Sequence, residues 1–263
     1  MNGKIKKLIN EAVIKIIEHT SSQAKMEHLQ EKHNVKIHFI PKRYRIFGGI
    51  LQSMNIQFGN FIEVLMALLV ENDGRYKIIS DYSGKKNNSF ELSLKNEILI
   101  DNYITRCQTE NINIDVEFPK LLKQIIANNN GRIIKFKHDI DLLFRDKTTD
   151  KIYYLECKYN DDHDTGKFVD INRKFIKTYA YLAKELNITD SDKLIPILFF
   201  FTNKKMKGNI YIPENSNIGR GKNFFEEFLK VKYDDVDQYL LNLSESPDAI
   251  KAFKDLYDKT MST

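Results

Sequence analysis

The stretch "IDLLFRDKTTDKIYYLECKY", from Ile140 to Tyr159, organises the predicted sheet. Its two ends are rich in aliphatic and aromatic residues, and the polar segment 145–151 separates them, which predicts two strands joined as a hairpin. Both strands carry charged residues. A buried sheet tolerates such charges only when they are paired or bound to a metal ion. The acids and the base of this hairpin are therefore the first candidates for a functional site.

Side chains alternate between the two faces of a strand. Asp139 and Asp141 therefore share one face of the first strand. On the second strand, Glu156 and Lys158 share a face. A hairpin brings these faces together, and a divalent cation relieves the repulsion between the acids. Mg²⁺ prefers such oxygen ligands. The alternative is a structural salt bridge between Lys158 and one acid.

The rest of the chain predicts further strands and a set of flanking helices. We expect a helix, or two, over 4–33, and further helices over 58–72, 96–108, 118–130, 166–186 and in the tail 221–258. In addition to the hairpin strands 132–144 and 151–159, we expect strands over 76–80 and 194–202. Residues 41–54 are expected to form a basic loop. The helix between 151–159 and 194–202 makes these two strands parallel neighbours with a right-handed crossover.

Composition narrows the class of protein. The 263 residues include 41 Lys and Arg against 36 Asp and Glu, a net charge of +5 that suits an anionic partner. The two cysteines, Cys107 and Cys157, exclude a disulfide framework and a four-cysteine zinc site. The amphipathic, charged start differs from a signal peptide, and no run approaches about 18 apolar residues. We expect a soluble, cytoplasmic protein without a membrane span.

An Asp on one strand, followed after a polar turn by Glu-Xaa-Lys on the next, is similar to the PD-(D/E)XK nuclease superfamily. Here the matching residues are Asp141 and the triplet Glu156-Cys157-Lys158. The usual Pro before the Asp is missing from "HDID" at 138–141, which leaves Asp139 as an alternative to the favoured Asp141. The resemblance covers about residues 131–203.

This resemblance implies an active site with one or two Mg²⁺ ions. Asp141, Glu156 and the backbone carbonyl of Cys157 would hold the metal, and Lys158 would assist the attacking water or stabilise charge on the phosphate. Glu63 is the only charge within "FIEVLMALLV" and resembles the Glu that many restriction enzymes carry on an early helix near the metal. Its alternative role is a buried pair with a Lys or Arg.

Two further segments, "KYNDDHDTGKFVDINRKF" and "FGNFIE", resemble small type II restriction endonucleases that cut the interrupted palindrome GANTC. The resemblance implies an α/β fold with a restriction-endonuclease-like core, a mixed central sheet flanked by helices, and helical N- and C-terminal additions. We expect a single nuclease domain over 1–263, with a mainly helical N-terminal region over 1–130, a catalytic core over 131–203, and basic loops and helices over 204–263. Double-stranded DNA would be the substrate, cut by a homodimer, and a cognate DNA methyltransferase would be a genetic partner.

Basic residues outside the hairpin are candidates for DNA contacts. Contacts with DNA phosphates determine the affinity for DNA, and contacts with base edges determine the sequence specificity. Arg220 lies in a Gly-flanked loop and would suit bidentate reading of guanine. For any single lysine, a solvated surface charge is the alternative. The candidates are Lys42, Arg43, Arg45, Lys167, Lys204, Lys205, Lys207, Arg220 and Lys222.

Two other functions fit some features of the pattern. A structure-specific or repair nuclease of the same superfamily, such as a junction resolvase, would use the same acids, although the long flanking segments argue against it. A non-catalytic DNA-binding protein would use the acids in salt bridges, and it would bind DNA equally well in the presence of a chelator.

Overall fold

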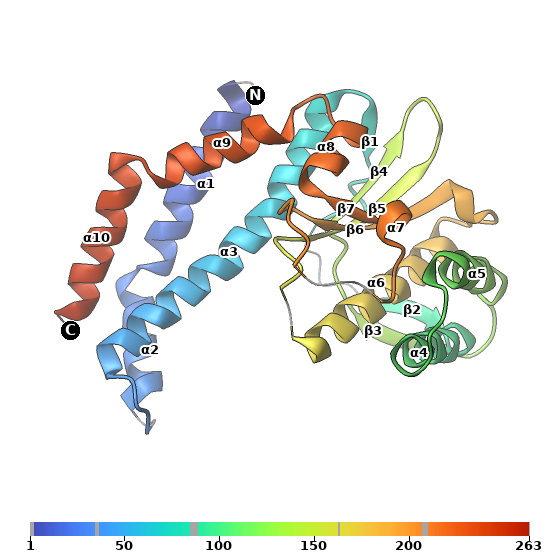
Figure 1. The fold of residues 1–263 in the computed structure, drawn as a ribbon, viewed down its shortest axis with the longest axis horizontal. Helices are drawn as coiled ribbons and strands as arrows, with labels where there is room; N and C mark the ends of the chain where they lie inside the picture. Colours follow the sequence, from blue (N-terminus) through green and yellow to red (C-terminus); the bar gives the residue numbers. More distant parts are fainter. Residues whose placement is uncertain (1–2, 35–36, 85–88, 163, 207–209, 263) are drawn as a thin grey trace. The chain divides into compact units, whose positions relative to one another are not determined.

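The computed structural model describes residues 3–34, 37–84, 89–162, 164–206 and 210–262 (Figure 1). Contacts divide the chain into two compact units. The helical unit comprises Met1–Leu65 and Val231–Thr263, and the sheet unit comprises Met66–Lys230. This division differs from the three regions that we expect along the sequence, and a single nuclease domain over 1–263 stays a prediction.

The helical unit contains α1 (Gly3–Thr20), α2 (Gln23–Asn34), the first three quarters of α3 (Lys42–Asp73), α9 (Tyr233–Ser244) and α10 (Pro247–Met261) (Figure 1). Residues 4–33 thus lie in two helices rather than one. At the end of α1, the hydroxyl groups of Thr20 and Ser21 each donate a 2.6 Å hydrogen bond to a carbonyl of the preceding turn. Such bonds offer the backbone an alternative to helix continuation. The core of this unit contains Ile17, Met26, Leu29, Ile46, Ile50, Met54 and Leu256.

The prediction of a basic loop over 41–54 is wrong, because α3 covers nearly all of this segment. Ile46, Ile50 and Met54 recur every four residues and are at most 2% exposed, so one apolar stripe stabilises the helix here. Two adjacent glycines cost about 1 kcal/mol each within a helix, and the burial of this stripe offsets them. Gly49 also allows α2 to approach, because a Cβ at this position would lie 3.1 Å from a leucine side chain of α2.

α3 is also long and apolar enough, by length and composition alone, to be a candidate membrane span. Its most apolar window of 18 residues has a mean hydropathy of 1.4, and 39% of that window is buried inside the protein. A core helix of a soluble protein passes the same test. Since Ile50, Leu65 and Met66 on α3 are 0% exposed, we interpret α3 as a core helix.

The sheet unit is built on a five-stranded mixed sheet in the order β1-β4-β5-β6-β7. β4 and β5 pair antiparallel, as the hairpin pattern predicts, and β5 and β6 pair parallel, as the intervening helix predicts. The two edge strands, β1 and β7, pair antiparallel with β4 and parallel with β6, respectively. The predicted α/β fold, with a mixed sheet flanked by helices and with helical terminal segments, is confirmed. The strands are β1 (Tyr76–Ile78), β4 (Leu142–Asp146), β5 (Ile152–Lys158), β6 (Leu194–Phe200) and β7 (Ile218–Arg220).

Helices cover both faces of this sheet. On one face α6 contributes Phe175, whose ring stacks on Tyr154 of β5 at a centroid distance of 5.2 Å. On the opposite face α8 places Phe224 4.7 Å from the ring of Phe199 on β6. Asp164 caps α6, and its Oδ1 accepts a 2.9 Å hydrogen bond from the backbone N–H of Lys167, the third helical residue. The helices of the unit are α4 (Leu94–Thr109), α5 (Ile114–Ala127), α6 (Thr165–Glu185), η1 (Ser191–Lys193), α7 (Glu214–Asn217) and α8 (Gly221–Phe228).

The prediction of one continuous strand over 132–144 is wrong. Its first half, β3 (Ile133–Lys137), pairs with β2 (Ser89–Ser93) in a separate two-stranded sheet, and β4 starts only at Leu142. Between them, Ile140 is fully buried and forms an isolated bridge with Gly84. The chain passes from one sheet to the other here, so it leaves the ladder for a few residues. Asp141 therefore lies just outside β4.

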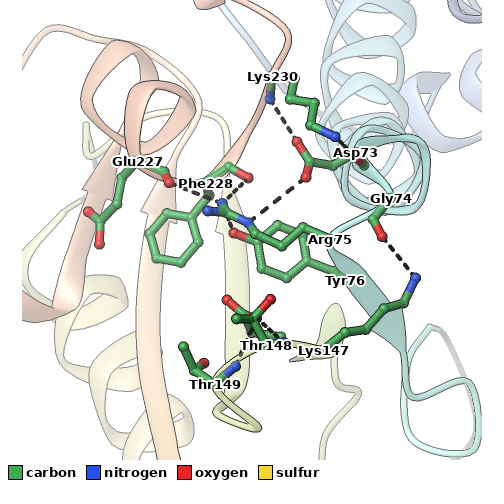
Figure 2. Close-up of polar contacts among 11 residues, drawn as sticks. Asp73, Gly74, Arg75, Tyr76, Lys147, Thr148, Thr149, Glu227, Phe228 and Lys230 are labelled. Carbon is green, nitrogen blue, oxygen red and sulfur yellow. Dashed lines mark hydrogen bonds and ion pairs between the residues drawn. The ribbon is translucent and has the colours of Figure 1, made fainter.

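A polar network lies at the turn end of the hairpin, where β1 pairs with the last residues of β4 (Figure 2). Nη2 of Arg75 donates hydrogen bonds to the carbonyl oxygens of Glu227, at 3.1 Å, and Phe228, at 2.9 Å. The buried carboxylate of Asp73 accepts a 2.7 Å hydrogen bond from the backbone N–H of Lys230. This network ties the end of α3 to the end of α8, and it contains no residue of the predicted site.

Candidate active site

The predicted acids and base of the hairpin meet at its open end. Glu156 lies on β5 and is 4% exposed. In the antiparallel register Leu142 pairs with Leu155, so the next position brings Asp141 beside Glu156. Nζ of Lys158 lies 2.7 Å from Oε1 of Glu156 and 3.6 Å from Oδ2 of Asp141. The structure therefore brings the three residues of the predicted motif together.

Asp141 is fixed by the backbone of the neighbouring strand. Its Oδ2 accepts a 2.7 Å hydrogen bond from the backbone N–H of Cys157. This bond continues the hydrogen-bond ladder between β4 and β5 beyond the first residue of β4. A hydrogen bond to a carboxylate is stronger than one between two neutral groups. Asp139 is half-buried and makes none of these contacts. The geometry thus distinguishes Asp141 from Asp139, whereas the sequence leaves open which of the two belongs to the cluster.

Lys158 marks a point on which three oxygen atoms converge. Besides its two carboxylate neighbours, its Nζ donates a 2.9 Å hydrogen bond to the carbonyl oxygen of Cys157. Glu156, Asp141 and this carbonyl are the ligands that the superfamily resemblance assigns to Mg²⁺. In this structure the ammonium group of Lys158 occupies a position from which a cation contacts all three oxygens. Two carboxylates and a carbonyl fit Mg²⁺, which takes its other ligands from water and phosphate.

The electrostatics of the cluster favour the charged forms. Burial alone raises the pKa of Glu156, but the charge of Lys158 and its hydrogen bonds outweigh burial and hold that pKa well below its usual range. Burial alone likewise lowers the pKa of Lys158, and the charges of Glu156 and Asp141 raise it above its usual value. Glu156 is therefore ionised and Lys158 carries its charge at neutral pH.

Two residues of the cluster were not among the predicted site residues. The hydroxyl group of Tyr154 donates a 2.9 Å hydrogen bond to Oε2 of Glu156. Nε2 of His138 lies 3.4 Å from the same oxygen. For Tyr154 a signal existed, because it shares a strand face with Glu156 and Lys158. For His138 the predicted continuous strand concealed the bend that turns it toward β5.

Glu63 is half-buried on α3 and belongs to the helical unit, whereas the hairpin belongs to the sheet unit. Its role in metal binding stays a prediction. Among the described residues, no group of three or more His, Cys, Asp and Glu side chains gathers as a metal site. The three oxygens beside Lys158 come from the carboxylates of Asp141 and Glu156 and from the backbone carbonyl of Cys157.

Most of the predicted DNA contacts are exposed. Lys42 and Arg43 are exposed at the start of α3, and Arg45 is half-buried there. Lys207 lies outside the residues that the structure describes. In the sheet unit the exposed candidates are Lys167, Lys204, Lys205 and Lys222.

Arg220 differs from the expected guanine-reading residue. It ends β7, is 8% exposed, and its guanidinium group is paired inside the protein. Nη2 lies 3.0 Å from Oδ2 of Asp161, and Nε lies 2.5 Å from Oε1 of Glu214. The sequence does not reveal this burial, because the short strand β7 falls in a segment that reads as a loop.

Comparison with known proteins identifies the family. The family model described as "Type II restriction endonuclease, HinfI" matches residues 1–244. The chain belongs to the HinfI family of type II restriction endonucleases. The type II restriction enzyme HinfI of Haemophilus influenzae is 62% identical over 263 residues, which are 100% of this chain and 99% of the relative. No solved structure matches the chain.

Membership of the HinfI family confirms the resemblance to small type II restriction endonucleases and establishes the class of activity. The chain is a type II restriction enzyme, a site-specific deoxyribonuclease that acts on DNA. A repair nuclease and a non-catalytic DNA-binding protein, the two alternatives from sequence, are therefore set aside.

Proposed function

We propose that this enzyme cuts DNA by Mg²⁺-dependent hydrolysis at the cluster of Asp141, Glu156 and Lys158. The observation that carries the proposal is the convergence of three oxygens on one cationic group, at 2.7, 2.9 and 3.6 Å. Oppositely charged groups this close, in a site that buries Glu156 almost completely, are typical of a functional cluster.

In the proposed site, Asp141, Glu156 and the carbonyl group of Cys157 hold one Mg²⁺ ion, and Glu63 is a candidate ligand for this ion or for a second one. The bound ion supplies a Lewis acid and stabilises the charge that develops on the phosphate. The ammonium group of Lys158, beside these ligands, would orient the attacking water or stabilise a phosphate oxygen.

The electrostatic environment supports these roles. Because Lys158 and the hydrogen bonds lower the pKa of Glu156, this carboxylate is ionised and ready to bind a cation at neutral pH. Tyr154 has a pKa well above its usual value, through burial and the neighbouring acids, so its hydroxyl group stays protonated. It can hold Oε2 of Glu156 while the other carboxylate oxygen faces the metal.

We further propose that the recognition sequence is GANTC, the site that HinfI cuts. An interrupted palindrome has two-fold symmetry, and a homodimer matches it with one active site for each strand. The exposed lysines and arginines named above are the candidate phosphate contacts. A cognate DNA methyltransferase as genetic partner, and a cytoplasmic location, complete the proposal.

Two measurements test specificity and assembly together. Wild-type enzyme in Mg²⁺ is incubated with a duplex that contains one GANTC site and with a matched duplex in which one specified base is changed. We expect the first duplex to be cut about 5- to 150-fold faster, because each wrong base pair costs about 1–3 kcal/mol. Light scattering of the enzyme bound to the cognate duplex in Ca²⁺ should give the mass of two subunits on one duplex. Equal cleavage of both duplexes would refute the specificity, and a monomer on cognate DNA would refute the homodimer.

A further inference from the structure

Asp161 follows the catalytic strand and is completely buried. It lies three residues beyond Lys158, just after β5 ends. A buried carboxylate is costly unless a charge and hydrogen bonds satisfy it. The partners of Asp161 therefore indicate what this segment of the chain holds in place.

The charge of Asp161 is satisfied by Arg220 from the edge strand. Oδ2 of Asp161 lies 3.0 Å from Nη2 of Arg220, whose side chain is 9% exposed. The guanidinium carbon of Arg220 lies 5.1 Å from the centroid of the Phe200 ring on β6. Arg220 also pairs with Glu214 at 2.5 Å. The side chain is thus fixed on three sides, and the planar fork of arginine suits such a position.

The same two acids bind the basic segment that follows β6, residues 202–206. Oδ1 of Asp161 accepts a 2.9 Å hydrogen bond from the backbone N–H of Met206. Oε2 of Glu214 lies 3.2 Å from Nζ of Lys205. Each acid therefore connects Arg220 to this segment, which carries two of the candidate phosphate contacts.

The basic segment is also attached to the catalytic strand itself. The backbone N–H of Phe201 donates a 2.8 Å hydrogen bond to the carbonyl oxygen of Lys158, and that of Thr202 donates a 2.9 Å bond to the carbonyl oxygen of Tyr159. Segment 202–206 is thus held at its start by the end of β5 and at its end by Asp161. A displacement of this segment would move its lysines relative to Lys158.

We propose that Asp161 and Arg220 are positioning residues, which lock the basic segment 202–206 to the end of the catalytic strand. In this arrangement a DNA phosphate bound by the segment is presented in register to the Asp141–Glu156–Lys158 cluster. The inference rests on the proposed active site. It assigns Arg220 to the assembly of the site rather than to a base contact.

The test separates positioning from stability. Asp161→Asn keeps the size of the side chain and removes its charge. Asp73→Asn is the matched control, because Asp73 is a buried acid beside an arginine at the turn end of the hairpin (Figure 2). For each variant, urea denaturation gives stability, binding to a GANTC duplex in Ca²⁺ gives affinity, and single-turnover cleavage at saturating DNA in Mg²⁺ gives the rate.

We expect Asp161→Asn to lower the single-turnover rate about 10- to 100-fold, because small misplacements of reacting groups cost this much. Its affinity for DNA should change less than its rate. Asp73→Asn should lose stability and cut at the wild-type rate. A wild-type rate for folded Asp161→Asn, or an equal loss in Asp73→Asn, would overturn the proposal.

Two more variants keep the test decisive. Arg220→Lys retains the positive charge and loses the planar guanidinium group. It should therefore lower the cleavage rate while the protein stays folded. If Asp161→Asn does not fold, Arg220→Lys alone tests the proposal. The double variant Asp161→Asn/Arg220→Lys should cut no more slowly than the slower of its two single variants, since the effects of residues that act as one unit are not additive. Additive losses would contradict the pairing. Failure of the active-site proposal would instead appear as normal cutting by Lys158→Ala.

Discussion

The backbone N–H of Cys157 donates a 2.7 Å hydrogen bond to Oδ2 of Asp141. This bond places one acid of the cluster beside the other at the point where the chain enters β4. Asp141 thereby has a fixed carboxylate beside Lys158, and Asp139, two residues earlier, does not share these contacts. The two acids should therefore respond differently to substitution.

Asp141→Asn should abolish most of the cleavage activity, whereas Asp139→Asn should cut near the wild-type rate. A metal ligand supplies several kcal/mol of transition-state stabilisation, which corresponds to a loss of about 10³-fold or more. Cleavage of a GANTC duplex under single-turnover conditions measures both variants. A larger loss in Asp139→Asn than in Asp141→Asn would show that the other acid holds the metal.

Lys158→Ala and Glu156→Gln should separate metal binding from catalysis. The ammonium group of Lys158 lies among the proposed metal ligands, so its removal should leave Mg²⁺ or Ca²⁺ binding as tight as in the wild type, or tighter, while cleavage is lost. Glu156→Gln should lose both. Titration calorimetry of each variant with the metal ion measures binding. Weaker metal binding by Lys158→Ala would contradict the arrangement.

Tyr154→Phe should lower both stability and metal affinity. It leaves Oε2 of the buried Glu156 without its 2.9 Å donor, and the loss of such a bond costs about 1–3 kcal/mol. Partners that orient a metal ligand are typically worth about 10- to 100-fold in metal affinity or activity. Tyr153→Phe, on the opposite face of β5, is the control. Equal effects of the two substitutions, in urea denaturation and in the Mg²⁺ dependence of cleavage, would rule out a special role for Tyr154.

The ion pairs of Glu214 make stability depend on pH. Burial alone raises the pKa of Glu214, but Arg220 and Lys205 outweigh burial and lower it below its usual value. A carboxylate whose pKa is lower in the folded state stabilises the fold above the pKa of the unfolded chain, about 4.3, and loses this effect as the pH falls further. Wild type should therefore exceed Glu214→Gln in stability at pH 7, and the difference should shrink below about pH 4. A difference that grows on acidification would contradict the ion pairs. Urea denaturation across this pH range measures it.

The fold could be predicted from the sequence where local pattern and tertiary structure agree. The polar turn between two apolar runs predicted the β4–β5 hairpin, and apolar residues at helical spacing predicted α6. The fully apolar strand after this helix indicated a parallel neighbour covered on both faces. Predicting these features requires only the spacing of apolar residues and the residue types of turns, both of which are local in the sequence.

The prediction from sequence is wrong where contacts between distant residues override the local sequence pattern. The two glycines and the basic residues of segment 41–54 read as a loop, but packing of Ile46 and Ile50 in the helical unit makes it a helix. The run over 132–144 has no local break, and only its pairing with two different sheets divides it. Arg220 looked like an exposed DNA contact because its sequence neighbourhood does not reveal its ion pairs with the buried, distant Asp161 and with the half-buried Glu214.

The most direct test of the central claim is a digest of plasmid DNA that contains GANTC sites, in Mg²⁺ and in EDTA. Wild type is compared with Lys158→Ala and with Lys77→Ala, an exposed lysine on β1. Wild type and Lys77→Ala should give the same discrete fragments with ends at GANTC, and Lys158→Ala or EDTA should leave the DNA intact. Wild-type fragments from Lys158→Ala would show that the catalytic groups lie outside this hairpin.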